Sequence, residues 1–227
     1  MNNIIISGLT AAGKTTHSHL LCEEHGFHYI SASRILLGLA GLDAVQPLDF
    51  WVSPKGIELS KTFSWKDVDT EFQKIERAST NTVFDCQTLP WLQTRKGMSL
   101  WIDSSLESRV FKARVSYAGQ STLSDTEIRN KIIKKDELAQ KHIFSNYGVD
   151  LFQDRKPFDL IIDISSFITE ASVAASHISI RKSHEIIDNA VRWYLYGDNK
   201  SKMNLDKYFI NYGEKVIIQY PQRPLSS

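Results

Sequence analysis

The sequence predicts an α/β fold built on a parallel β-sheet. Two observations lead to this prediction. Short apolar runs alternate with helix-like segments along most of the chain, and a glycine-rich turn joins the first apolar run to the first helix. Strands that alternate with helices are typical of a sheet with helical crossover connections. The chain has 227 residues, 42% of them hydrophobic, which predicts one large domain or one domain with an appendage.

Five short apolar runs have the continuity expected of buried parallel strands. They cover residues 2–7, 27–30, 82–86, 98–102 and 157–163. Helix-like segments separate them, and two of these begin with a capping box, in which a serine is followed three residues later by a glutamate. The predicted helices cover residues 13–25, 31–41, 66–79, 104–117 and 124–147. This order predicts a five-stranded parallel sheet flanked by helices.

Other regions show weaker patterns. Residues 42–64 predict a loop-rich segment, because two prolines and a glycine interrupt it. Residues 169–196 predict a helix that is broken near 179–181. The tail 198–227 has no assigned role, although its stretch 215–220 is apolar enough to be an edge strand or a docking segment.

The turn after the first strand carries the most specific signal. Residues Gly8–Thr16 match the pattern G-x-x-x-x-G-K-T between a predicted strand and a predicted helix, which is typical of a phosphate-binding loop. Backbone N–H groups and the helix N-terminus attract phosphate oxygens there. Lys14 is suited to neutralise β- and γ-phosphates, and the Thr15 hydroxyl to ligate Mg²⁺. The residues expected to bind the nucleotide are Gly8, Thr10, Ala11, Ala12, Gly13, Lys14, Thr15 and Thr16.

Three predicted strands end in an aspartate. Ligands of open α/β sheets bind beyond the carboxyl ends of the strands, so Asp85 is the best candidate to hold Mg²⁺ through water. Asp103 and Asp163 are weaker candidates for the same role. The alternative role of all three is to cap the turn that follows.

Basic residues gather on the two helices that flank residues 118–123. Arg109 and Arg114 precede this break, and several basic residues, among them Lys135, follow it. The arrangement predicts a hinged lid whose cations neutralise a triphosphate, because phosphoryl transfer depends on positioning and charge neutralisation. Ion pairs with neighbouring carboxylates on a solvated surface are the alternative for the arginines.

Four aromatic residues lie in or beside the loop-rich segment: Phe50, Trp51, Phe63 and Trp65. They pack beneath the loop, or they form a stacking wall for a base. The sequence leaves both interpretations open.

Composition excludes several classes of function. A net charge of +1 gives no electrostatic case for nucleic-acid binding. No apolar run is long enough to span a membrane, and no signal peptide precedes the first strand, so we expect a cytoplasmic protein. Cys22 and Cys86 are expected to be buried, reduced thiols, and the seven histidines show no metal-binding pattern.

Blocks of residues in a fixed order resemble the cytidylate-kinase-like P-loop nucleoside monophosphate kinases. The resemblance extends from about Ile4 to Ile180. Its blocks are Gly8–Thr16, Gly26–Ser33, Val83–Gln87 with Trp91, Trp101–Val110, Lys134–Asp150 and Pro157–Ser165. The phosphate-binding loop is specific to the superfamily. The other blocks support the resemblance by their order and spacing.

The resemblance implies the P-loop kinase fold over residues 1–197, with a helical acceptor-binding insert at about 31–80 and a short lid at about 115–135. ATP and Mg²⁺ would be the donor, and a cytidine- or deoxycytidine-type nucleoside monophosphate the acceptor. The residues expected to act on the transferring phosphoryl group are Lys14, Asp85, Arg109, Arg114 and Lys135. Those expected to face the acceptor are Arg34, Asp69, Gln87 and Arg95.

The chain departs from the family at its anion-binding arginines. Leu37 and Gln87 stand where the family has arginines, and the Arg-Asp of the helix after the lid is Lys135-Asp136 here. A lysine does not reproduce a bidentate arginine fork, and glutamine carries no charge. Either the acceptor is not an ordinary nucleoside monophosphate, or Arg34 and Arg95 replace the missing groups from new positions.

The leading hypothesis is therefore an ATP-dependent kinase that acts on a small acceptor, a (deoxy)cytidine-type or modified pyrimidine nucleoside monophosphate. A phosphate acceptor needs no strong general base, whereas a hydroxyl acceptor would draw on Asp85 or Asp69. A catalytically degenerate nucleotide-binding regulator is the alternative. A kinase acting on polynucleotide ends is a third reading, which the near-zero net charge disfavours.

Overall fold

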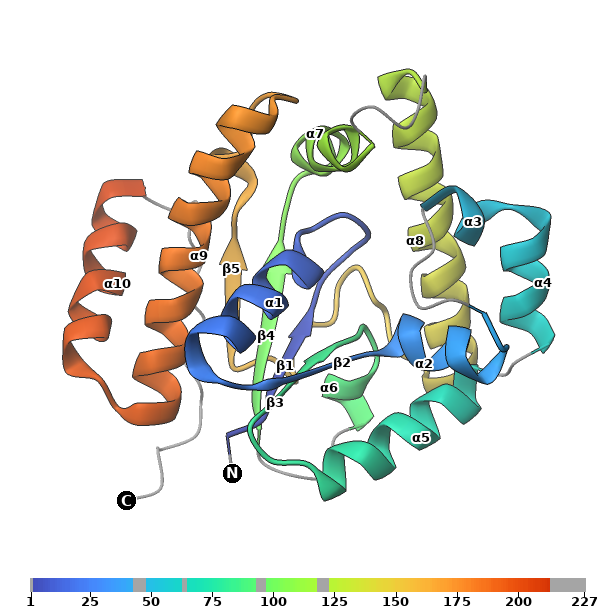
Figure 1. The fold of residues 1–227 in the computed structure, drawn as a ribbon, viewed down its shortest axis with the longest axis horizontal. Coiled ribbons are helices and arrows are strands. Elements are labelled where there is room, and N and C mark those ends of the chain that lie inside the picture. The colour runs from blue at the N-terminus through green and yellow to red at the C-terminus, as the bar shows by residue number, and fades with distance from the viewer. Residues whose placement is uncertain (1, 43–47, 63–64, 93–96, 118–122, 213–227) are drawn as a thin grey trace.

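A five-stranded parallel sheet forms the centre of the protein (Figure 1). The computed structural model describes residues 2–42, 48–62, 65–92, 97–117 and 123–212. The strands are β1 (Ile4–Ser7), β2 (His28–Ser31), β3 (Thr82–Asp85), β4 (Met98–Asp103) and β5 (Leu160–Asp163). Their order is β2-β3-β1-β4-β5, which confirms the predicted parallel α/β sheet.

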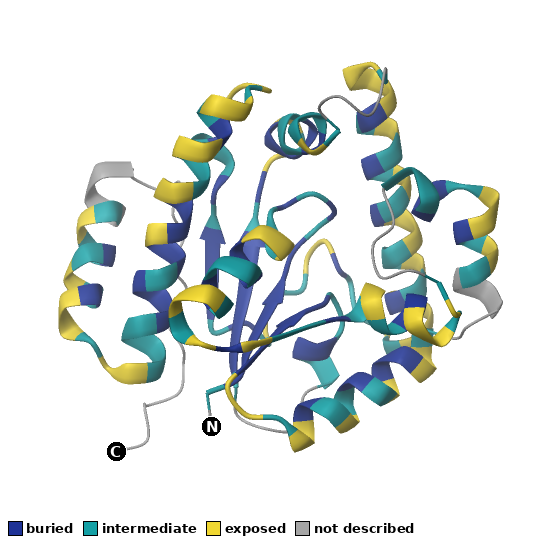
Figure 2. Cartoon of the chain, in the orientation of Figure 1, coloured by how far each residue is buried: buried dark blue, intermediate teal, exposed yellow. Residues whose placement is uncertain are grey.

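The central strand β1 is buried on both faces. Ile4, Ile5 and Ile6 are fully buried, which explains why the strand is a continuous apolar run rather than an alternating one. Ile4 and Ile6 join the core cluster beneath helices α1 (Lys14–His25) and α9 (Val173–Tyr196), and Ile5 joins the cluster on the opposite face. Figure 2 shows the strands as the buried centre of the molecule.

Helix α9 is continuous, so the predicted break near 179–181 is wrong. The Ser183 hydroxyl donates to the carbonyl oxygens of Ser179 and Ile180, one turn back in the same helix. The polar side chain of Ser183 therefore has partners within the helix and is compatible with its continuity. Helix α10 (Asn199–Tyr212) lies beside α9 and places Leu205 in the largest core cluster (Figure 1).

Residues 31–80 are mostly helical. They form α2 (Ala32–Leu39), α3 (Leu48–Val52), α4 (Pro54–Thr62) and α5 (Trp65–Ala78). The prediction of a loop-rich segment at 42–64 is therefore wrong for the described residues 48–62. Pro54 is compatible with a helix because it occupies the first helical position, where its missing N–H has no partner to lose.

The aromatic residues of this region serve packing first. Trp51 is buried in a cluster with Leu36, Leu37 and Val68, and Phe50 and Trp65 pack against that cluster. Phe63 lies outside the described residues. Trp51 therefore serves packing, which was one of the two interpretations. One face of its ring can still contact a neighbouring cation.

Two helices flank residues 118–122, which lie outside the described part of the chain. They are α7 (Leu106–Ser116) and α8 (Asp125–Tyr147). The predicted capping box of α8, Ser124 with Glu127, is confirmed. Helix α7 is capped by Ser105 rather than Ser104, because the Ser104 hydroxyl accepts a hydrogen bond from Lys112 instead.

The remaining elements are the short helix α6 (Leu89–Leu92) and the 3₁₀ turn η1 (Ser165–Phe167). The predicted hinge and the apolar stretch 215–220 fall on residues that are not described. Within the described ranges, no helix combines the length and the apolar character that crossing a membrane requires. Cys22 and Cys86 are both free thiols, with Cys86 buried and Cys22 partly exposed.

The packing of α10 on α9 yields a stability prediction. Leu205 is 1% exposed, whereas Met203 of the same helix is 61% exposed. Leu205→Ala is expected to lower the free energy of unfolding by about 2–5 kcal/mol, because it removes buried methyl groups and leaves a cavity. Urea denaturation followed by circular dichroism measures this. Met203→Ala is the matched control, and an equal effect of both substitutions would contradict the packing.

Candidate functional site

The glycine loop runs from the end of β1 into the first turn of α1. Gly13 precedes the helix with a φ of 106°, and Gly8 has a φ of 154°. A Cβ atom on Gly8 would lie 2.5 Å from the carbonyl oxygen of Ile102. Both the backbone angle and the close approach of β4 therefore require glycine at position 8.

Lys14 is folded back onto its own loop. Its ammonium group donates to the carbonyl oxygens of Gly8 and Leu9, both at 2.9 Å. Burial lowers the pKa of Lys14, and the carboxylates of Asp85 and Asp136 partly counteract this shift. The side chain is thus held at the loop beside two acids, where an incoming phosphate would offer it a better partner.

Thr15 and Asp85 meet at the carboxyl ends of the strands. The Thr15 hydroxyl donates to Asp85 Oδ2 at 2.6 Å, and the Tyr29 hydroxyl donates to the same oxygen at 3.0 Å. Burial and the neighbouring Asp85 carboxylate raise the pKa of Tyr29, which keeps the phenol protonated. Tyr29 was not among the predicted site residues, because nothing in a two-sided strand pattern indicates where its hydroxyl points.

A buried ion pair supports the loop from below. Arg109 Nη1 lies 2.5 Å from Asp136 Oδ2, and both side chains are buried. The same arginine donates to the carbonyl oxygen of Thr10 at 3.2 Å, and Asp136 Oδ1 accepts from the Thr10 N–H at 2.9 Å. Arg109 therefore contacts the loop by holding the backbone of Thr10, and its role towards a transferring phosphoryl group stays a prediction.

Lys135 reaches the same region from α8. Its ammonium group lies 5.2 Å from the centre of the Trp51 ring, which is a cation–π contact. Burial and repulsion from Lys14 lower the pKa of Lys135 to about 8, although Asp136 and Asp85 oppose the shift. The structure thus places a second partly desolvated cation beside the loop.

Arg114 lies at the outer end of α7. It binds Asp125 with N–O distances of 2.9 and 2.5 Å and donates to the Leu123 carbonyl oxygen. Its side chain is partly exposed. In this conformation Arg114 joins the two helices that flank residues 118–122 and does not contact the loop.

Lys112 is a loop-contacting cation that the sequence prediction missed. Its ammonium group donates to the carbonyl oxygen of Ala12 at 3.0 Å and to Ser104 Oγ at 2.7 Å. Burial and repulsion from Arg109 lower the pKa of Lys112 to about 7. The sequence does place Lys112 one helical turn after Arg109, on the same face of α7, and this spacing could have indicated the contact.

A cavity of ≈ 250 Å³ opens beside the loop. Loop residues and the first turn of α1 form one wall, and Lys112, Val115 and Ser116 of α7 form another. Ile168, Ser176 and Ile180 close the third side. The cavity therefore combines the backbone of the glycine loop with apolar walls, a combination that suits a small-molecule ligand.

The residues predicted to face the acceptor are placed differently from one another. Arg34 is exposed and stacks over the Tyr29 ring at 5.0 Å, and Gln87 Nε2 lies 3.4 Å from the Gly8 carbonyl oxygen. Both therefore lie on the loop's side of the sheet. Arg95 lies outside the described residues. Leu37 is fully buried in the core, so no polar side chain extends from that position.

Asp69 is occupied by structural hydrogen bonds. It is 4% exposed and accepts from Thr88 Oγ1 at 2.5 Å and from the Tyr147 hydroxyl at 2.7 Å. Its carboxylate thereby joins α5 to α8 and to the turn before α6. A role for Asp69 towards an acceptor remains a prediction, and it would act by holding these elements in place.

The comparisons with known proteins agree with this geometry. The chain is 27% identical to a cytidylate kinase of Pyrococcus abyssi over 183 residues, which cover 80% of the chain and 95% of that protein. It is 28% identical to the cytidylate kinase of Pyrococcus furiosus over 165 residues, covering 72% and 80%. For the cytidylate kinase of Sulfolobus acidocaldarius the identity is 24% over 192 residues, covering 82% and 99%.

One solved structure shows a similar fold, and a second is reported beside it. An uncharacterised protein from Eubacterium ventriosum matches with a TM-score of 0.51 and 15% identity, over 78% of this chain and 95% of that one. A shikimate kinase from Bacteroides thetaiotaomicron matches with a TM-score of 0.47 and 11% identity, over 82% and 98%. No protein-family profile matches the chain. The chain is therefore similar to cytidylate kinases over most of its sequence, and its glycine loop and five-stranded parallel sheet agree with this similarity.

Proposed function

We propose that the protein transfers the γ-phosphoryl group of ATP to a small acceptor, a (deoxy)cytidine-type or modified pyrimidine nucleoside monophosphate. The observation that carries this proposal is the meeting of Thr15 with Asp85 at the mouth of the glycine loop, within 2.6 Å. Names of the sequence relatives support the nucleotide class of the acceptor.

The donor half has a complete set of phosphate-binding groups. Loop amides and the N-terminus of α1 would bind the phosphate oxygens, and Lys14 would turn from the carbonyl oxygens of Gly8 and Leu9 to the β- and γ-phosphates. The adjacent cavity has apolar walls suited to a nucleoside and a cation, Lys112, suited to its phosphates.

The Thr15 hydroxyl and the Asp85 carboxylate fit Mg²⁺. Both are hard oxygen donors of the kind that Mg²⁺ prefers, and a hydrogen bond of 2.6 Å holds them together beside the glycine loop. We propose that Thr15 ligates Mg²⁺ directly and Asp85 through water. When bound, the ion would neutralise charge on the donor phosphates.

Transfer requires charge neutralisation rather than covalent chemistry from the protein. Lys135 lies beside the loop and is held over Trp51, so its cation can face the transferring group. Arg109 acts by fixing the backbone of Thr10 and lending positive charge to the loop. Arg114 would contribute only after leaving Asp125, as part of a closing lid.

The acceptor half uses a reduced set of anion-binding groups. Arg34 is exposed, and its guanidinium lies 5.0 Å from the centre of the Tyr29 ring. Gln87 offers a neutral amide where related kinases have an arginine. We propose that Arg34 binds the acceptor's anionic group and that Gln87 contributes a hydrogen bond to it.

Lys14→Ala is expected to lower turnover by about 100-fold or more, because one preorganised cation at the transferring group is removed. The measurement is ADP formation from ATP and Mg²⁺ with CMP, dCMP, UMP, the corresponding nucleosides and modified pyrimidine nucleotides. If ATP binds but no acceptor yields ADP above background, the kinase proposal falls and a nucleotide-binding regulator replaces it.

Arg34→Ala is expected to raise the KM for the acceptor about tenfold or more and to leave the KM for ATP unchanged, because a charge-assisted hydrogen bond to the acceptor is lost. Arg129→Ala is the matched control, since this surface arginine of α8 pairs with Glu107 only among the described residues. A rise in both KM values in Arg34→Ala would assign Arg34 a structural role instead.

Lys112 predicts a pH dependence of ATP binding. Its pKa of about 7 means that the group loses its charge as the pH rises above 7, whereas bound phosphates favour the charged form. The affinity for ATP is therefore expected to fall above pH 7, by about tenfold per pH unit at most. Lys112→Arg stays charged and should remove this part of the dependence. Kd values for ATP from pH 6 to 9 provide the test, and identical profiles of the two proteins would contradict it.

A further inference from the structure

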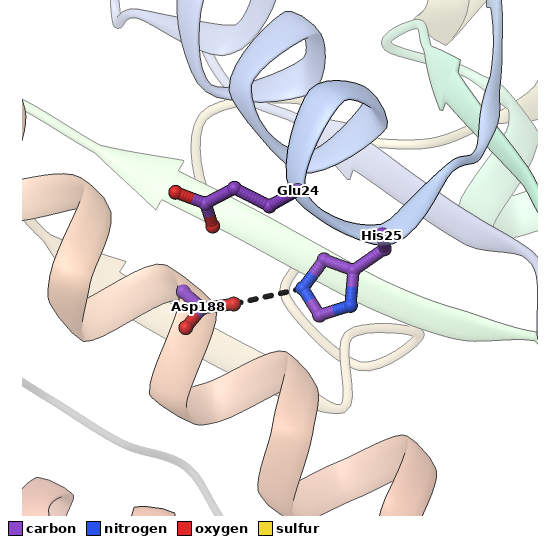
Figure 3. Close-up of side chains that lie close together, drawn as sticks. All are labelled: Glu24, His25 and Asp188. Atoms are coloured by element: carbon purple, nitrogen blue, oxygen red, sulfur yellow. Dashed lines mark hydrogen bonds and ion pairs between the residues drawn. The ribbon is translucent and has the colours of Figure 1, made fainter.

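Three side chains with metal-ligating atoms meet between α1 and α9. Glu24 and His25 come from the C-terminal end of α1, and Asp188 comes from the middle of α9 (Figure 3). One ligand atom from each lies within 4.8 Å of the other two. We propose that these residues bind a divalent transition-metal ion of the zinc class, which joins the two helices. The proposal does not depend on the kinase activity.

The distances need little change to accept an ion. His25 Nε2 lies 2.7 Å from Asp188 Oδ1. Ligand atoms around a tetrahedral ion with bonds of about 2.0–2.2 Å are about 3.3–3.6 Å apart, so the pair must open by about 0.6–0.9 Å. The His25 side chain is 5% exposed, whereas that of Glu24 is 41% exposed. The exposed carboxylate leaves a path for an ion to enter.

The atoms that face away from the site already have partners. Arg192 Nε donates to Asp188 Oδ2 at 2.7 Å, which leaves Oδ1 for the ion. The Tyr196 hydroxyl lies 3.5 Å from His25 Nδ1, on the far side of the imidazole ring. Such outer contacts fix the orientation of ligating side chains in metal sites.

A second imidazole supplies an independent observation. His184 lies one turn before Asp188 on α9 and is 5% exposed. Its Nε2 atom is buried and makes no hydrogen bond, although Glu24 Oε2 lies 3.1 Å away, so the angle rather than the distance is unfavourable. A buried nitrogen without a hydrogen bond is costly. An ion that draws the Glu24 carboxylate inward would place this carboxylate at a better angle to accept a hydrogen bond from His184 Nε2.

The donor set selects the class of ion. One imidazole nitrogen and two carboxylates suit zinc and neighbouring transition metals, whereas Mg²⁺ and Ca²⁺ prefer oxygen ligands only. The two negative charges of Glu24 and Asp188 exceed the single positive charge of Arg192, so a cation is favoured. A bound ion would fix the end of α1, whose first turn carries the glycine loop, against α9.

The test uses the full chain, freed of metal by a chelator and then dialysed. Titration with Zn²⁺ alone, followed by calorimetry and thermal unfolding, is expected to show one ion per chain and a rise in Tm. Glu24→Gln and His25→Ala are each expected to weaken binding at least tenfold. His177→Ala is the matched control, because His177 is an exposed histidine of helix α9. This variant should bind Zn²⁺ as the unmodified protein does.

Absence of one-to-one binding, or binding that neither variant weakens, would overturn the proposal. Loss of binding in Cys22→Ser but not in Glu24→Gln would also overturn it, because the ion would then be held by the nearby thiol. If His25→Ala does not fold, Glu24→Gln decides, since its side chain is largely exposed. If His25 and Asp188 form only a hydrogen bond and no metal site, His25→Ala should lower the stability of the protein, and Zn²⁺ should not change the stability of the unmodified protein.

Discussion

The buried pair of Arg109 and Asp136 is the interaction on which the site depends. It joins α7 to α8, and both residues bind the backbone of Thr10, one through the N–H and the other through the carbonyl oxygen. Removing one partner of such a pair leaves a buried charge and costs about 3–5 kcal/mol. Glycine residues allow the loop its backbone conformation, whereas this ion pair holds the loop in its position in the fold.

Three partly desolvated lysines lie around the loop. Burial is the main cause that lowers the pKa values of Lys14, Lys112 and Lys135, and repulsion from neighbouring cations adds to it. Phosphate oxygens at the proposed donor site would favour the charged forms of these lysines, because they would replace part of the lost solvation.

The donor and acceptor halves that we propose for the site have different characters. The donor half combines loop amides, Lys14, Thr15 and Asp85 in one cluster. On the acceptor side Leu37 belongs to the core and Asp69 is bound by Thr88 and Tyr147, so fewer charged groups remain for an acceptor. Helices α2 to α5 are held together by Trp51 and its aliphatic neighbours, which shape the acceptor side by packing rather than by charge.

The sequence by itself determined the parallel sheet, the glycine loop, the capping box of α8 and the acid at the end of β3, because each depends on a local pattern of apolar, glycine or capping residues. Tertiary structure decided which side chains meet. Whether Arg114 faces the loop or Asp125, that Lys112 reaches Ala12, and that His25 meets Asp188 all depend on how helices distant in sequence pack together. The seven histidines show no metal-binding spacing along the chain for the same reason: the candidate ligands come from α1 and α9, more than 160 residues apart, and only the packing of these helices on one face of the sheet brings them together.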